Sequence, residues 1–104
     1  MILREWRGRT TPAKAADYPR HFREIVVPEL RGIPGFLGAT LSRREQDGRI
    51  EFLVLTQWRS MAAIRAFAGS DPGKAVVEPG AVAALADFDD TVRHYEVIEN
   101  VVTD

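Results

Sequence analysis

The stretch RIEFLVLTQW, residues 49–58, is the longest run of β-branched and aromatic residues in the chain. As a strand it places successive side chains on opposite faces, and large apolar residues occur on both faces. One face carries Ile50, Phe52, Val54, Thr56 and Trp58, and the other carries Glu51, Leu53, Leu55 and Gln57. We therefore expect a central strand that is covered on both sides.

The dipeptide Asp47-Gly48 directly precedes this strand and is typical of a two-residue β-hairpin turn. Such a turn joins strand 49–58 to an earlier strand, residues 36–45, and fixes the register between them. The predicted opposite pairs are Arg44 with Glu51, Leu41 with Val54, and Leu37 with Trp58. A slip of one residue would exchange the two faces of the strand, so this register decides which side chains meet the core.

The remaining elements follow from caps, breakers and periodicity. We expect a first strand over Ile2–Arg9, a helix from Asp17 that is bent by Pro28, a second helix from the cap Ser60 to Gly69, a short helix over Ala81–Phe88, and a last strand over Thr91–Glu99. With right-handed crossovers the order β-α-β-β-α-β gives a ferredoxin-like α+β fold. It has a four-stranded antiparallel sheet with both main helices on one face.

Length and composition limit the classes of function. The 104 residues correspond to one domain, residues 1–104, and the net charge of −1 gives no basic surface for nucleic acid or an acidic membrane. The chain has no cysteine, which excludes disulfides and thiolate metal sites. We find no signal peptide and no apolar run long enough to span a membrane, so we expect a cytoplasmic protein.

Several motifs resemble the antibiotic biosynthesis monooxygenase family over about residues 1–98. They are the strand-to-helix junction Leu55-Thr56-Gln57-Trp58-Arg59-Ser60, then Phe67, Ser70-Asp71, Lys74-Ala75-Val76, Pro34-Gly35-Phe36 and the closing Val92-Arg93-His94-Tyr95-Glu96-Val97. Members of that family are dimeric α+β barrels. Some oxidise polycyclic aromatic compounds without metal or flavin, and relatives degrade haem. The resemblance implies a cofactor-independent monooxygenase that acts on a small aromatic or polyketide-like compound.

The chain departs from the family pattern at positions that carry chemistry there. The haem-degrading relatives use an asparagine on the first strand and a histidine after the second helix, in addition to the junction tryptophan. Here the first strand has no asparagine, and Val76-Val77 stands where that histidine would be. The aromatic oxygenases carry an asparagine shortly before the tryptophan, where this chain has Val54. We therefore do not expect haem degradation of the usual kind.

The candidate catalytic residue is His94, in the last strand, because a half-buried imidazole can exchange a proton near neutral pH. The alternative is a histidine that is hydrogen-bonded within the core or an interface. Tyr95 should point to the opposite face. His21 lies at the edge of the first helix and is expected at the surface or its boundary. The acidic residues Asp87, Asp89 and Asp90 are expected in a solvated turn and not at a metal site.

Four residues are candidates for binding substrate: Trp58, Arg4, Trp6 and Phe67. In the family the tryptophan that matches Trp58 lines the pocket, although Trp58 could equally be a core residue under Met61 and Phe67. Arg4 could hold an anionic or phenolate oxygen, or it could pair across strands with Glu96 or Glu99. Trp6 could stack on an aromatic ring.

The sequence leaves open whether the protein is an enzyme at all. One reading is the monooxygenase, with His94 or Arg4 assisting deprotonation and stabilising the substrate anion. A second is a binding or structural module whose pocket is filled by side chains. A third is a lyase or isomerase that uses His94 as its base. A fold alone does not choose between them.

The second face of strand 49–58 predicts a homodimer, because the residues around Leu53 and Leu55 are too apolar to remain in water. Replacing Leu53 with lysine should weaken self-association before it unfolds the helix-facing core, since it places a charge in the interface only. Analytical ultracentrifugation of the wild type and L53K measures this. A wild-type protein that sediments as a stable monomer at micromolar concentration would contradict the prediction.

Overall fold

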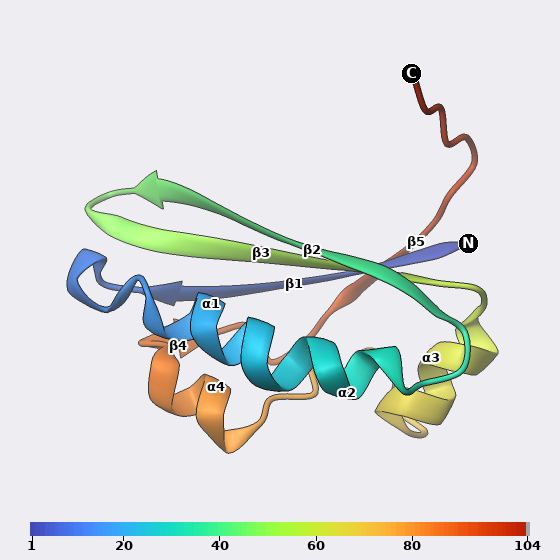
Figure 1. Cartoon of the computed structure of the whole chain (residues 1–104), viewed down its shortest axis with the longest axis horizontal. Coiled ribbons are helices and arrows are strands. Elements are labelled where there is room, and N and C mark those ends of the chain that lie inside the picture. Colours follow the sequence, from blue (N-terminus) through green and yellow to red (C-terminus); the bar gives the residue numbers. More distant parts are fainter. Residues whose placement is uncertain (104) are drawn as a thin grey trace.

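A computed structural model, which describes residues 1–103, confirms the ferredoxin-like arrangement (Figure 1). The strands are β1 (Ile2–Thr10), β2 (Phe36–Gln46), β3 (Arg49–Trp58), β4 (Asp87–Phe88) and β5 (Arg93–Glu96). Their order in the sheet is β2–β3–β1, with both β4 and β5 paired to the outer edge of β1, and every pairing is antiparallel. The central place of residues 49–58 is therefore confirmed.

The hairpin between β2 and β3 has the predicted turn and register. Asp47 and Gly48 both adopt positive φ angles, 52° and 74°, which is the geometry of a turn that matches the strand twist. Arg44 lies opposite Glu51, and its Nε donates a hydrogen bond to Glu51 Oε1 at 2.9 Å. Leu41 lies opposite Val54, also as predicted.

The predicted pairing of Leu37 with Trp58 is wrong, because the register shifts between Phe36 and Gly38. An extra residue at this point of β2 turns Leu37 outward, where it is 48% exposed. Phe36 takes its place opposite Trp58, with the two ring centroids 5.5 Å apart in an edge-to-face arrangement. The irregularity therefore places an aromatic residue over the end of β3.

All the helices lie on one face of the sheet (Figure 1). They are the 3-10 turn η1 (Pro12–Lys14), α1 (Asp17–His21), the π-helical segment η2 (Phe22–Val26), α2 (Val27–Arg31), α3 (Met61–Ala68) and α4 (Pro79–Ala84). The predicted bend before Pro28 is confirmed as the wider turn η2, and α2 then starts with Pro28 in its first turn. A proline is tolerated there because the first N–H groups of a helix have no helical partner. No helix among residues 1–103 is long and apolar enough to cross a membrane.

The C-terminal third differs from the sequence prediction in two places. The expected helix over Ala81–Phe88 ends at Ala84, and the chain turns into β4, where backbone N–H groups of Ala86 and Asp89 donate to carbonyls of β1. Of the expected strand Thr91–Glu99, only the residues of β5 form a strand. One residue beyond β5, the Val97 N–H donates to the Met1 carbonyl at 2.9 Å, just before the start of β1.

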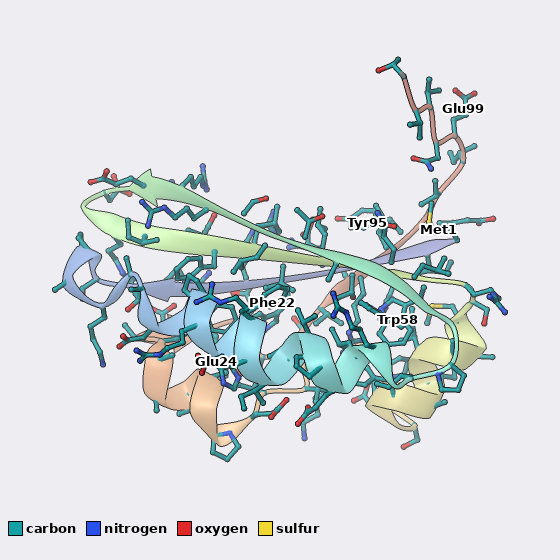
Figure 2. All side chains as sticks on the ribbon, viewed as in Figure 1. Met1, Phe22, Glu24, Trp58, Tyr95 and Glu99 are labelled. Carbon is teal, nitrogen blue, oxygen red and sulfur yellow. The ribbon has the colours of Figure 1, made fainter. Side chains whose placement is uncertain are left out.

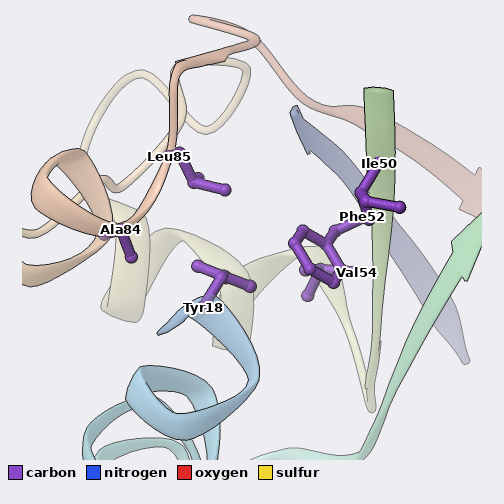
Figure 3. Close-up of a cluster of buried hydrophobic side chains, with 7 residues drawn as sticks. Tyr18, Ile50, Phe52, Val54, Ala84 and Leu85 are labelled. Carbon is purple, nitrogen blue, oxygen red and sulfur yellow. The ribbon is translucent and has the colours of Figure 1, made fainter. Parts of the chain in front are cut away.

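The core between sheet and helices forms two clusters. One gathers around Phe52 and Tyr18, which contact Ala84 and Leu85 from the α4 region (Figure 3). The other consists of Leu30, Trp58 and Ile64. Helix α3 contributes Ile64 and is capped as predicted: Ser60 Oγ accepts a hydrogen bond from the Ala63 N–H at 3.2 Å, and Gly69 follows its end with φ of 89°.

The opposite face of the sheet carries no helix, so within this chain β3 is covered on one side only. Figure 2 shows Tyr95 on this face and Trp58 on the helix face. Leu53 and Leu55 lie here among charged pairs, including Arg7 with Glu5 and Arg44 with Glu51. This uncovered surface is the basis of the homodimer, which remains a prediction.

Gly35, which lies between α2 and β2, is expected to tolerate a side chain poorly. Its φ is +88°, and an added Cβ would lie 2.5 Å from the Cβ of Ala63 on α3. Gly35→Ala should lower the free energy of unfolding by about 1–3 kcal/mol through backbone strain and a clash with a packed helix. Urea denaturation measures the change.

Gly32→Ala is the matched control for this substitution. Gly32 has a helical backbone conformation, and its added Cβ would meet only a carbonyl oxygen at 3.6 Å. Its free energy of unfolding should stay within about 0.5 kcal/mol of the wild type. Equal destabilisation by the two substitutions would contradict the account of Gly35.

Candidate functional site

A cavity of about 80 Å³ lies between the sheet and the helices, at the junction of the two core clusters, and opens to solvent. Strands β1 and β3 supply its floor, and the helices and the segment before α4 supply its walls. The lining residues are Arg4, Trp6, Tyr18, His21, Val26, Glu29, Leu30, Val54, Thr56, Phe67, Val76, Glu78, Ala81 and Val92. The predicted candidates Arg4, Trp6 and Phe67 therefore line the same cavity.

Arg4 is the charged residue most deeply placed in this cavity, with only 5% of its surface exposed. Its Nη1 donates to the carbonyl of Pro72 at 2.6 Å, and its Nη2 donates to the carbonyl of Lys74 at 3.1 Å. The expected pairing with Glu96 or Glu99 is wrong, because β5 places His94 opposite Arg4. Burial lowers the Arg4 pKa, and among residues 1–103 it forms no ion pair with a carboxylate.

A buried guanidinium without a counter-ion is unusual, since moving a charge out of water is costly unless it is paired. Carbonyl oxygens satisfy part of the Arg4 hydrogen-bonding capacity but do not neutralise its charge. The planar guanidinium group binds carboxylates and other anionic oxygens well. The Arg4 end of the cavity therefore favours a negatively charged ligand group.

Aromatic rings surround this end of the cavity. Phe67 lies with its ring centroid 5.8 Å from the Arg4 guanidinium carbon, and Trp6 is fixed by a hydrogen bond from its Nε1 to the Asp89 carbonyl at 2.7 Å. Trp58 is completely buried and stacks on Phe67 at 5.3 Å. It does not line the cavity itself but supports the ring that does. Its Nε1 also donates to Thr56 Oγ1 at 2.8 Å and so orients a hydroxyl group that faces the cavity.

His94 lies behind Arg4 and not on the cavity wall. Its Nε2 is 2.9 Å from Arg4 Nη1. Because a guanidinium can only donate, this nitrogen must be the unprotonated acceptor. Burial, and then the charge of Arg4, lower the His94 pKa. In this arrangement His94 orients Arg4; a direct part in proton transfer remains a prediction. Tyr95 points to the other face of the sheet, as expected.

The other end of the cavity carries polar residues that sequence reasoning did not select. They are Tyr18 and His21 of α1, Glu29 of α2 and Glu78 just before α4. His21 was expected at the surface or its boundary, and it is half-buried against the cavity. No sequence signal pointed to the two glutamates, because they are distant in the chain and only the tertiary fold places both in the cavity lining.

The acidic residues near β4 are engaged by arginines. Asp87 pairs with both Arg9 and Arg49, and Asp89 accepts from Arg9 at 2.8 Å. The hydrogen bonds from Arg49 and then Arg9 lower the Asp87 pKa. Within residues 1–103 no group of three or more histidine, cysteine, aspartate or glutamate residues is placed to hold a metal ion.

Comparison with known families gives one match, the family described as antibiotic biosynthesis monooxygenase, over residues 1–79. No curated protein matches the chain. The matched range includes most of the cavity residues, from Arg4 to Glu78.

Solved structures share the fold over nearly the whole chain. The haem-degrader MhuD from Mycobacterium tuberculosis is 21% identical, with 98% of this chain and 100% of that chain covered and a TM-score of 0.64. The monooxygenase ActVA-Orf6 of Streptomyces coelicolor, in complex with nanaomycin D, is 18% identical, with coverages of 99% and 91% and a TM-score of 0.62. SnoaB from Streptomyces nogalater, a cofactor-independent oxygenase, is 18% identical, with coverages of 96% and 94% and a TM-score of 0.57.

The contact between Arg4 and His94 predicts a pH dependence of stability. The folded-state pKa of His94 is lowered, so the unfolded chain binds more protons than the folded chain below the ordinary value of 6.5. The contribution of His94 to the free energy of unfolding should be complete above about pH 6.5 and should be lost as the pH falls through the lowered pKa. Urea denaturation between about pH 5 and pH 7.5 measures it.

His94→Gln is the matched variant, because a glutamine oxygen can accept from Arg4 but does not titrate. The variant should lose the part of the pH slope that His94 causes and keep the slope due to other groups. Identical pH slopes in the wild type and His94→Gln would contradict this role.

Proposed function

The chain belongs to the antibiotic biosynthesis monooxygenase family, and from this premise we propose that it oxidises a small aromatic molecule through an anion of the substrate. The co-reactant is molecular oxygen, and the reaction uses neither metal nor flavin. The proposal rests on one observation. Arg4 is a buried cation at the aromatic end of the cavity, and it has no carboxylate partner among residues 1–103.

The chemistry needs a substrate that can lose a proton and pass electrons to oxygen. Removing a proton from a ring hydroxyl or an activated CH₂ group leaves an electron pair delocalised over the ring and its oxygen. Arg4 stabilises this charge because its interaction with an anion is strong in a site shielded from water. In the overall balance a CH₂ group becomes C=O, one atom of O₂ enters the product, and the other leaves as water.

The size of the cavity bears on how a substrate enters it. The cavity of about 80 Å³ is smaller than the ~150 Å³ that holds a benzene molecule in a protein core. A ligand must therefore extend into the mouth or displace part of the wall. The segment between α3 and α4 is irregular and contributes Val76 and Glu78 to the wall. We propose that this segment moves outward to admit the substrate.

The small cavity also favours a second candidate, a binding module that holds a ligand without turning it over. The two candidates differ in whether a bound aromatic anion leads to consumption of oxygen. A lyase or isomerase with His94 as base is a weaker candidate, because Arg4 already occupies the His94 Nε2 lone pair. In either case we propose that a second copy of the chain covers the open face of the sheet.

Replacing Arg4 tests the proposal directly. Calorimetric titration with 2-naphthoate and its uncharged analogue 2-naphthamide should show a preference of the wild type for the carboxylate. Arg4→Gln should weaken 2-naphthoate binding by about 10- to 100-fold, the loss of a charge-assisted hydrogen-bonded pair, and should change 2-naphthamide binding little.

Arg4→Lys keeps the charge and should retain part of the preference, which guards against a variant that only misfolds. Arg20→Gln removes an exposed arginine outside the cavity and should leave both affinities unchanged. Equal affinity of the wild type for the two compounds would contradict the anion site.

A further inference from the structure

Besides Arg4, the cavity is lined by a cluster of titratable side chains, of which Glu29 is exposed and Glu78 half-buried. Tyr18, His21, Glu29 and Glu78 come from three different elements and line the same cavity. The proposed oxidation through Arg4 does not use them. From their arrangement we infer which second polar group the ligand carries, and this inference rests on the proposed function.

Tyr18 is buried but unpartnered. It is 3% exposed, and its hydroxyl has no hydrogen-bond partner among residues 1–103 although its side chain lines the cavity. Burial, followed by the negative charge of Glu78, raises the Tyr18 pKa well above its ordinary value. The hydroxyl therefore stays protonated at neutral pH. The Tyr18 side chain lines the cavity, so a ligand that enters can form a hydrogen bond with its hydroxyl.

His21 gives a second, independent sign of an unfilled site. Its Nε2 is buried and has no hydrogen-bond partner. The ring is held between the Tyr18 ring, 5.9 Å away between centroids, and the backbone at Gly80, where any added Cβ would lie 2.7 Å from the imidazole. The glycine therefore permits this close approach of α4 to His21 and keeps the ring facing the cavity.

Glu78 and Glu29 complete the cluster. Glu78 precedes the first turn of α4, but its side chain does not cap that helix. It instead lines the cavity with its acidic partner Glu29. Burial, and then this partner, raise the Glu78 pKa. The mouth therefore presents carboxylate oxygens as acceptors and carries net negative charge.

We propose that Glu78, together with Glu29, Tyr18 and His21, forms a second polar site that binds a hydroxyl group on the far end of an aromatic anion. The hydroxyl donates to the Glu78 carboxylate, and its oxygen can accept from the Tyr18 hydroxyl. The two ends of the cavity then impose one orientation: the negative mouth repels the anionic group of the ligand, and Arg4 attracts it.

A matched pair of ligands tests the second site. 2-Naphthoate and 6-hydroxy-2-naphthoate differ only in a hydroxyl group at the far end of the ring system from the carboxylate. The wild type should bind the hydroxylated compound about tenfold more tightly, the effect expected of one hydrogen bond to a charged acceptor. Calorimetric titration of both compounds measures the ratio of affinities.

The variant Glu78→Gln should reduce this preference to about twofold or less while binding 2-naphthoate at least as well as the wild type, because it removes a repulsive charge. Glu24→Gln is the control. Glu24, labelled in Figure 2, is an exposed glutamate on the neighbouring helical segment that does not line this cavity. That variant should keep the full preference. Equal binding of the two naphthoates by the wild type, or an unchanged preference in Glu78→Gln, would overturn the second site.

2-Naphthol, which lacks the carboxylate, separates failure of the second site from failure of the proposed function. It should bind the wild type and Arg4→Gln alike but bind Glu78→Gln several-fold more weakly. If neither naphthoate binds and 2-naphthol still depends on Glu78, the anion site fails and the second site stands. If 2-naphthol binding does not respond to Glu78→Gln, the second site is overturned.

Discussion

The guanidinium of Arg4, a buried charge without a carboxylate partner among residues 1–103, is the constraint around which the cavity is arranged. Strand β1 carries it into the interior, where two carbonyls of the segment before α4 and the His94 ring receive its N–H groups. These bonds tie β1, β5 and the irregular segment together. They leave the charge itself without a counter-ion, and this makes the cavity suited to an anion.

The two ends of the cavity differ in a way that only the tertiary fold creates. Arg4 and Trp6 come from strand β1, whereas Tyr18, His21 and Glu29 come from α1 and α2, and Glu78 precedes α4. Such a separation of positive and negative ends is a means of orienting a flat ligand, whose rings alone would bind in several ways. Burial lowers the Arg4 pKa, whereas partial burial and then the neighbouring Glu29 raise the Glu78 pKa.

The sequence was informative wherever local chemistry determines structure. The Asp47-Gly48 turn, the alternation in β3 and the Ser60 cap are each specified by a few adjacent residues, and the predictions from them are confirmed. The predictions that were wrong concern features that depend on contacts between residues distant in the sequence. The irregularity that turns Leu37 outward has no local signal, and the length of the last strand depends on its pairing with β1.

The same distinction between local and long-range determinants explains which residues of the site were predicted from the sequence. Arg4 and Trp6 were selected because they alternate on one strand and carry a cation and an aromatic ring, and Phe67 because it lies on the inward stripe of its helix; all three line the cavity. The partner of Arg4 was predicted wrongly because cross-strand register between β1 and β5 is not encoded by any turn. Glu29 and Glu78 were missed because only the tertiary fold places both in the cavity lining.

The most direct test of the account is a crystal structure of the protein bound to 6-bromo-2-naphthoate, with the bromine located by its anomalous scattering. The account predicts the carboxylate against the Arg4 guanidinium, the rings beside Trp6 and Phe67, and the bromine toward the mouth near Glu78. A ligand in the reverse orientation, or one bound on the open face of the sheet with the cavity unchanged, would contradict it.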